Sequence, residues 1–251
     1  MSRSSETRPT LRADGRAPDE LRPVQIEPGF VRTAAGSALI AMGGTRVICT
    51  ASLVDGVPAW RVGSGSGWLT AEYGMLPAST GARRQRDSAR GRPDGRTVEI
   101  QRLIGRSLRA VVDLDALGER TVYLDCDVLE ADGGTRCAAV TGAYVALKLA
   151  LDELADSGAL TGVPLRSSVA AVSCGIVAGE PVLDLDYRED SAAAVDMNVV
   201  MTGAEELVEV QATGEGVAFS REDLDRLLEL AAAGIASLRR VQDETAGPLS
   251  S

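Results

Sequence analysis

The stretch LDCDVLEADGGTR at residues 124–136 decides the fold, because it joins a strand to a helix through two glycines. Residues 121–129 alternate between apolar and polar side chains, a pattern typical of a strand with one buried face. Gly133 and Gly134 favour a tight turn, and an apolar segment rich in small residues follows to about Leu154. We therefore expect a strand followed by a helix that packs closely against a sheet.

Strands and helices alternate on both sides of this unit. Hairpins are predicted over 37–54, 169–187 and 194–212, and further helices over 100–112 and 221–241. This order indicates an α+β or mixed sandwich rather than a doubly wound sheet. We find no internal repeat and no clear linker. We expect one domain over 12–241, a flexible extension over 1–11 and a flexible tail over 242–251.

Histidine is absent from the chain, which excludes histidine acid–base chemistry, Ser–His–Asp and Cys–His catalysis, and histidine metal sites. Any chemistry of this protein must therefore use carboxylates, arginines, hydroxyls or backbone amides. The net charge of −10 is unevenly divided. Residues 1–110 hold 17 basic and 10 acidic side chains, whereas residues 111–251 hold 9 and 26. This asymmetry indicates an anionic partner that meets the first half.

The cellular compartment of the protein is predicted from features that the sequence lacks. No apolar run reaches the roughly 18 residues of a membrane helix, and residues 1–10 lack the apolar stretch of a secretory signal. The four cysteines have no CxxC spacing, so reduced core residues are favoured over a disulfide or zinc framework. We expect a cytoplasmic protein without membrane contact.

An arginine-rich loop is the strongest physical signal in the sequence. Its arginines are Arg83, Arg84, Arg86, Arg90, Arg92 and Arg96, offset only by Asp87 and Asp94. Arginine matches the geometry of phosphate groups, so the loop favours binding of nucleic acid or phosphate. A solvated loop, or one that pairs with the acidic half, is the alternative. Few aromatic residues are interleaved, so base stacking is not the main expectation.

Two predicted helix N-termini offer a phosphate site. Arg96 stands directly before one helix, whose free amides attract an anion. Gly134, Thr135 and Arg136 open the other, where backbone amides and the threonine hydroxyl could hold one phosphate. A Gly-Gly pair before a helix is more often only a turn, so this interpretation depends on its pairing with Arg96. The GxGxG run at 63–67 does not match a nucleotide-binding pattern.

Two carboxylates stand out in the acidic segment 180–209, which holds nine acidic residues and one basic residue. Asp190 and Asp196 flank a stretch of small side chains. Paired carboxylates hold Mg²⁺ or serve as a general acid. The other interpretation is a solvated hairpin edge whose charges block aggregation, and the residues alone favour it.

Taken in order, these segments resemble the bacterial ribonuclease PH family of phosphate-dependent 3′→5′ exoribonucleases, which trim tRNA precursors. The resemblance extends from about residue 12 to residue 240. It is carried by RADGR at 12–16, ELRP at 20–23, GWLTAEYGMLP at 67–77, GRTVEIQRLIGR at 95–106, LDCDVLEADGGTR at 124–136 and EDSAAAVDMNVV at 189–200.

The resemblance implies a fold of two βαβ-like halves, packed as a mixed sheet-and-helix sandwich, and a ring-shaped hexamer built from dimers. It implies that inorganic phosphate is the co-substrate, bound by Arg96 and Gly134–Arg136, and that tRNA precursors and other RNA, including rRNA, are processed. Asp190 and Asp196 would be the catalytic carboxylates, holding Mg²⁺ or supplying a proton. Arg83, Arg84, Arg86, Arg90 and Arg92 would guide the RNA 3′ end.

Two other functions remain open from the sequence. One is a non-catalytic RNA-binding subunit of an exosome-like ring, which the presence of Arg96, Thr135, Arg136, Asp190 and Asp196 argues against. The other is a Mg²⁺-dependent hydrolytic nuclease, which would use water and release monophosphates. The expected phosphate pocket argues against it.

Overall fold

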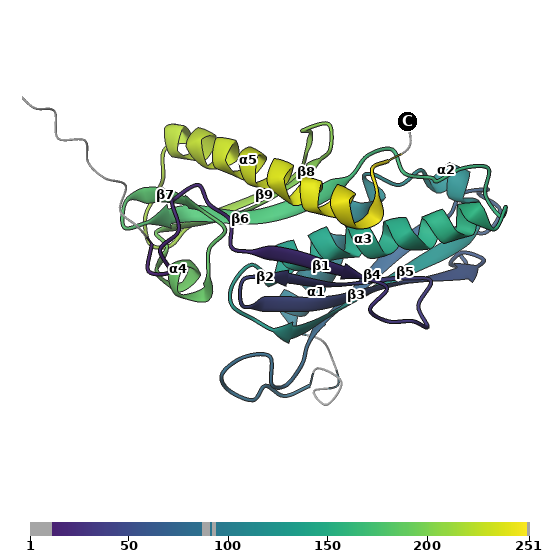
Figure 1. Ribbon diagram of the computed structural model, residues 1–251, viewed down its shortest axis with the longest axis horizontal. Helices are drawn as coiled ribbons and strands as arrows, with labels where there is room; N and C mark the ends of the chain where they lie inside the picture. Colours follow the sequence, from purple (N-terminus) through teal and green to yellow (C-terminus); the bar gives the residue numbers. More distant parts are fainter. Residues whose placement is uncertain (1–11, 87–90, 92–93, 250–251) are drawn as a thin grey trace, which may run out of the picture.

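The structure is a computed structural model that describes residues 12–86, 91 and 94–249 (Figure 1). The first sheet has the order β1-β2-β3-β5-β4, formed by β1 (Val24–Pro28), β2 (Gly36–Met42), β3 (Thr45–Asp55), β4 (Trp68–Met75) and β5 (Arg120–Glu130). The second has the order β7-β6-β8-β9, formed by β6 (Val169–Val177), β7 (Glu180–Leu183), β8 (Val195–Thr202) and β9 (Leu207–Gly214). The helices are α1 (Gly95–Arg109), α2 (Leu114–Leu117), α3 (Thr135–Asp156), α4 (Tyr187–Ala192) and α5 (Arg221–Ala246).

Each half of the molecule contains a strand–helix–strand unit. In the first half β4 and β5 are parallel neighbours, and α1 lies in the connection between them. In the second half β7 and β8 both pair antiparallel with β6, so they run in the same direction on either side of it. The helix α4 connects them, which gives a split βαβ arrangement. The expected α+β class with two βαβ-like halves is confirmed.

The helix α3 lies between the two sheets, in contact with β2 and β3 of the first and β6 of the second (Figure 1). It is buried on nearly all sides from Thr135 to Leu151, as its lack of a polar face requires. A Cβ added at Gly142 would lie 2.7 Å from Ile40 and 2.9 Å from Cys49. This close approach confirms the tight packing expected from its small residues. The helix α5 covers the second sheet beside α3.

The sequence prediction was wrong for the segment after β7. The strand expected over 182–187 ends at Leu183, and Tyr187 already begins α4. Asp184 leaves the sheet because its buried carboxylate accepts hydrogen bonds from Arg22, at 2.8 Å from the backbone amide and 2.7 Å from Nη2. Asp184 adopts a left-handed backbone conformation, with φ of 53°. A turn held by a buried ion pair therefore replaces the expected strand.

The chain ends also bear on the predictions. The helix α5 continues to Ala246, past its expected end at Val241, because the buried Gln242 donates hydrogen bonds to two backbone carbonyls. Residues 1–11 and 250–251, where flexible termini are expected, lie outside the described residues. All four cysteines are buried and free of disulfides, as expected. None of the helices that the structure describes is long and apolar enough to cross a membrane.

Candidate active site

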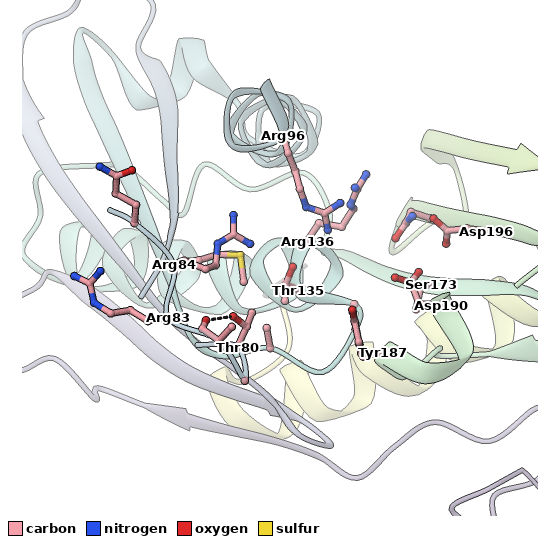
Figure 2. Close-up of a pocket in the computed structure, with 18 residues that line it drawn as sticks. Thr80, Arg83, Arg84, Arg96, Thr135, Arg136, Ser173, Tyr187, Asp190 and Asp196 are labelled. Atoms are coloured by element: carbon pink, nitrogen blue, oxygen red, sulfur yellow. Dashed lines mark hydrogen bonds between the residues drawn. The ribbon is translucent and has the colours of Figure 1, made fainter. Parts of the chain in front are cut away.

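A pocket of about 910 Å³ opens where the N-termini of α1 and α3 meet α4 and β8 (Figure 2). The expected phosphate and carboxylate residues all line it: Arg96, Gly134, Thr135, Arg136, Asp190 and Asp196. Figure 2 shows the two arginines reaching into the pocket from one side and the two aspartates from the other. Segments up to 100 residues apart in the chain thus form one mixed-charge site.

The N-terminus of α3 is open toward this pocket. No side chain caps the helix, and its first turn contains no acidic residue. The N–H groups of the first turn therefore lack intrahelical acceptors and carry partial positive charge. Gly133 and Gly134 have φ values of 74° and 65°, and a Cβ at Gly133 would lie 2.6 Å from the carbonyl oxygen of Leu185. Glycine at this position lets the segment before α4 approach the helix end.

Thr135 is oriented by a tyrosine from the first sheet. The Tyr73 hydroxyl donates a hydrogen bond of 2.9 Å to Thr135 Oγ1. Burial raises the pKa of Tyr73, so it remains a protonated donor at neutral pH. Because Thr135 Oγ1 accepts this bond, its own proton is directed elsewhere and is suited to an anion at the helix end.

Arg136 is held at one edge of its guanidinium group. Its Nη1 lies 3.2 Å from Glu99 Oε1 on α1 and 2.7 Å from Gln211 Oε1 on β9. Gln211 Nε2 donates in turn to Glu99 at 3.0 Å and to Glu209 at 2.8 Å, and Glu209 pairs with Arg106. This network joins α1, α3 and β9 around Arg136. Sequence reasoning did not find Glu99 or Gln211, because nothing in their local pattern indicates a shared partner.

The two carboxylates are close enough to affect each other. Burial raises the pKa of Asp196, the nearby charge of Asp190 raises it further, and Arg136 and Arg96 oppose these effects. The walls of the pocket also raise the pKa of Asp190 by removing water, against the same two arginines. Asp196 Oδ1 is buried without a hydrogen-bond partner among the described residues. A cation or a proton at this oxygen would satisfy it.

The donor set fits Mg²⁺ shared with a phosphate ligand. Among the described residues no three histidine, cysteine, aspartate or glutamate side chains gather as a complete metal cage. Mg²⁺ is commonly held by only one or two carboxylates and completes its shell with water and substrate phosphate oxygens. Asp190 and Asp196, with the unsatisfied Oδ1, meet this requirement.

The arginine loop is divided between the pocket and its surroundings. Arg83 and Arg84 line the pocket, and Arg84 lies 3.7 Å from Asp94, the residue that caps α1. Arg86 is exposed, does not line the pocket, and lies near Asp127, whose pKa it lowers against the larger raising effect of burial. Arg90 and Arg92 lie outside the described residues.

Buried arginines from the start of the chain fix the segment that carries Asp190. Arg12 donates to the Leu183 carbonyl at 2.6 Å and pairs with Glu189, directly before Asp190. Arg22 forms the buried ion pair with Asp184 described above. The interpretation of this acidic segment as a solvated hairpin edge was therefore wrong for Asp184 and Glu189, which have buried arginine partners, although Glu180, Glu205 and Glu206 are exposed.

Other pocket residues gave no signal in the sequence. Ser173, Tyr187 and Asn198 line the pocket from β6, α4 and β8. Strand positions of this kind cannot be assigned to a pocket until the sheet register is known. In the structure Asn198 pairs across the ladder with Gln211, so β9 contributes to the site through both the strand pairing and the Arg136 network.

Comparison with known proteins identifies relatives over most of the chain. Residues 20–151 match domain 1 and residues 167–234 match domain 2 of the 3′ exoribonuclease family. Ribonuclease PH of Roseobacter denitrificans is 56% identical over 232 residues, which cover 92% of this chain and 98% of that protein.

Solved structures of similar fold also match most of the chain. The Archaeoglobus fulgidus exosome with RNA bound to the active site contains a chain of 25% identity and TM-score 0.79, covering 92% of each chain. Rice (Oryza sativa) Rrp46 has 21% identity and a TM-score of 0.76, covers 94% of this chain and all of its own, and supports the fold alone. The chain therefore belongs to the ribonuclease PH family of phosphate-dependent 3′ exoribonucleases.

Proposed function

We propose that inorganic phosphate binds at the N-terminus of α3, between Arg96, Arg136 and the Thr135 hydroxyl. From there it attacks the last phosphodiester of an RNA 3′ end. A bond forms between a phosphate oxygen and the phosphorus of the terminal nucleotide, and the bond from that phosphorus to the preceding 3′ oxygen breaks. The products are a nucleoside 5′-diphosphate and RNA shortened by one nucleotide. Because a phosphoanhydride is formed, the reaction also runs in reverse as nucleotide addition.

The observation that carries this proposal is the open end of α3 facing two arginines and two carboxylates in one pocket. Two anions must meet in this reaction. Arg96, Arg136 and the helix amides neutralise and orient the attacking phosphate before the reaction, so little reorganisation is needed during it. No histidine is required, which agrees with its absence.

Asp190 and Asp196 would hold Mg²⁺ on the opposite side of the pocket. When bound, the ion offsets negative charge on the transferred phosphoryl group. The unsatisfied Oδ1 of Asp196 supports this assignment. The raised pKa values of both carboxyl groups also suit a proton donor to the departing 3′ oxygen, and the chain's own residues fit either role.

The RNA 3′ end would reach the pocket along the arginine loop. Arg83 and Arg84 line the pocket and Arg86 is exposed beside it, and by the resemblance Arg90 and Arg92 would also bind RNA. We further propose a cytoplasmic hexameric ring built from dimers that trims tRNA precursors and other RNA, including rRNA. The relative in the Archaeoglobus exosome with RNA at its active site supports RNA binding and assembly. A mass near that of one chain in solution would contradict the ring.

Charge-removing variants test the phosphate site. Arg96→Gln and Arg136→Gln should each raise the phosphate KM about tenfold or more, the effect of losing one charge-assisted hydrogen bond in a water-poor site. Arg102→Gln is the matched control, because this exposed arginine on α1 does not line the pocket. An unchanged phosphate KM in both pocket variants would refute the assignment.

A further inference from the structure

One aromatic side chain lines the pocket and has no part in the phosphorolysis proposed above. Tyr187 is 64% exposed, whereas aromatic residues make up only 3% of the chain. No other aromatic residue lines the pocket among the residues that the structure describes. Exposure alone does not distinguish it, because Trp60 is 66% exposed, but Tyr187 is the one exposed ring among the described residues that faces a pocket with polar, phosphate-binding chemistry.

Tyr187 lies near both the proposed phosphate site and the proposed catalytic carboxylates. It is the first residue of α4, and Asp190 lies three positions further on, so the two side chains are neighbours on the helix surface. In the view of Figure 2 the Tyr187 side chain lies between those of Thr135 and Asp190. The ring therefore adjoins the space between the proposed phosphate site and the proposed carboxylates.

The backbone of Tyr187 is fixed although its ring is exposed. Its N–H donates to Asp132 Oδ1 at 3.4 Å, and its carbonyl accepts from Ser191 Oγ at 2.6 Å. A Cβ at Gly133 would lie 2.9 Å from the Tyr187 nitrogen, so the turn before α3 packs directly against it. The point from which the ring extends is thus fixed near the helix end, so ligand binding has to order only the rotations within the side chain.

We propose that Tyr187 is a stacking platform for the base of the 3′-terminal nucleotide, an inference that rests on the proposed function. The reaction brings one nucleotide to this place, with its phosphate between the arginines and the carboxylates and its base beside them. A flat ring matches the face of any base, so stacking adds affinity without selecting a sequence. An enzyme that removes successive nucleotides requires this kind of contact.

A pair of substrates and a pair of variants test the platform. The substrates are an RNA with an ordinary 3′-terminal nucleotide and the same RNA with an abasic one; the variants are Tyr187→Ala and Tyr187→Phe. Tyr187→Ala should raise the KM for ordinary RNA by about fivefold to a hundredfold, the range for loss of one base–aromatic stack. The phosphate KM should stay unchanged. Tyr187→Phe, which keeps the ring, should behave as the unaltered protein does.

The abasic RNA separates stacking from other effects. It should bind the unaltered protein and Tyr187→Ala equally, because each complex lacks one member of the stack. If Tyr187→Ala weakens abasic and ordinary RNA to the same degree, or weakens neither, the platform is refuted. Another outcome is that Tyr187→Ala lowers the oligomer mass in solution while its RNA affinity per chain stays normal. That result would assign the Tyr187 side chain to a contact with another copy of the chain and would also refute the stacking platform.

A phosphate-free measurement keeps this test independent of turnover. RNA carrying 2-aminopurine at its 3′ end should lose fluorescence on binding, and Tyr187→Ala should abolish this quenching. If the unaltered protein makes no nucleoside diphosphate, the proposed function fails whatever the fluorescence shows. If it makes the diphosphate and Tyr187→Ala still quenches fully, only the platform fails.

Discussion

Replacing Gln211 by alanine is predicted to weaken phosphate binding while leaving RNA binding intact. Gln211 does not line the pocket, but its amide connects Arg136 with Glu99 and Glu209. In Gln211→Ala the Arg136 side chain keeps a single anchor, the 3.2 Å contact with Glu99. The guanidinium group is then less ordered before phosphate binds, so phosphate binding has to order it and becomes weaker.

The size of the effect follows from that ordering cost. Immobilising a long arginine side chain costs up to about 2 kcal/mol, and one of two anchors carries about half of it. A loss of roughly 1 kcal/mol corresponds to about a fivefold rise in phosphate KM. The variant also loses three hydrogen bonds between partly buried groups. Its free energy of unfolding should therefore fall by about 1–3 kcal/mol.

Initial rates against phosphate at saturating RNA, and against RNA at saturating phosphate, measure the two KM values separately. Val210→Ala is the matched control, because Val210 precedes Gln211 on β9 and its side chain points to the opposite face. A rise in RNA KM with an unchanged phosphate KM would refute the reasoning, as would an equal rise in both.

Three further predictions concern the carboxylates, the turn and the buried ion pair. Asp196→Asn should end turnover yet raise the melting temperature at pH 7, because burial raises the pKa of Asp196 and penalises its ionised form in the folded state. Thermal melts should show this gain vanish as the pH falls through the raised pKa of Asp196 to the ordinary pKa of an aspartate. Gly133→Ala should lower kcat at least tenfold in steady-state assays, because its Cβ would push the segment before α4 away. Gly158→Ala is the control: Gly158 has a similar positive φ but open space around it, so kcat should stay unchanged. Arg22→Ala should cost about 3–5 kcal/mol in urea unfolding, because it leaves the Asp184 carboxylate buried without its main partner.

The strand–turn–helix unit was predictable because its signals are local. Alternation in β5, the glycines at 133 and 134 and the apolar run of α3 lie next to one another in the sequence, and each favours the same structure. The gathering of Arg96, Arg136 and Asp196 was expected from the resemblance and, for the phosphate side, from two helix N-termini. The pocket brings these residues together as expected, and their roles remain predictions.

The turn after β7 was not predictable from local pattern. Leu183, Asp184 and Leu185 alternate as a strand does, yet Asp184 is drawn out of the sheet by Arg22, 162 positions earlier. A buried ion pair between distant residues outweighs strand propensity at this point. The missed helix α4 follows directly, since its Asp186–Glu189 capping box forms only after the chain has turned.

The network around Arg136 was missed for a related reason. Glu99 and Gln211 are separated by 112 positions, and their common role depends on α1 and β9 lying close enough for these side chains to meet. On the sequence Glu99 is one more charge on a helix, and Gln211 one polar position on a strand. Only the tertiary arrangement gives them a shared partner.

Phosphorolysis requires that phosphate, and not water, attacks the RNA. The most direct measurement incubates a tRNA bearing a few extra 3′ nucleotides with the protein and Mg²⁺, with and without inorganic phosphate, and separates the products by chromatography. We expect nucleoside diphosphates to appear only when phosphate is present. Monophosphates released without phosphate would show a hydrolase, and RNA binding without any product would show a non-catalytic ring subunit; either result would rule out phosphorolysis by this protein.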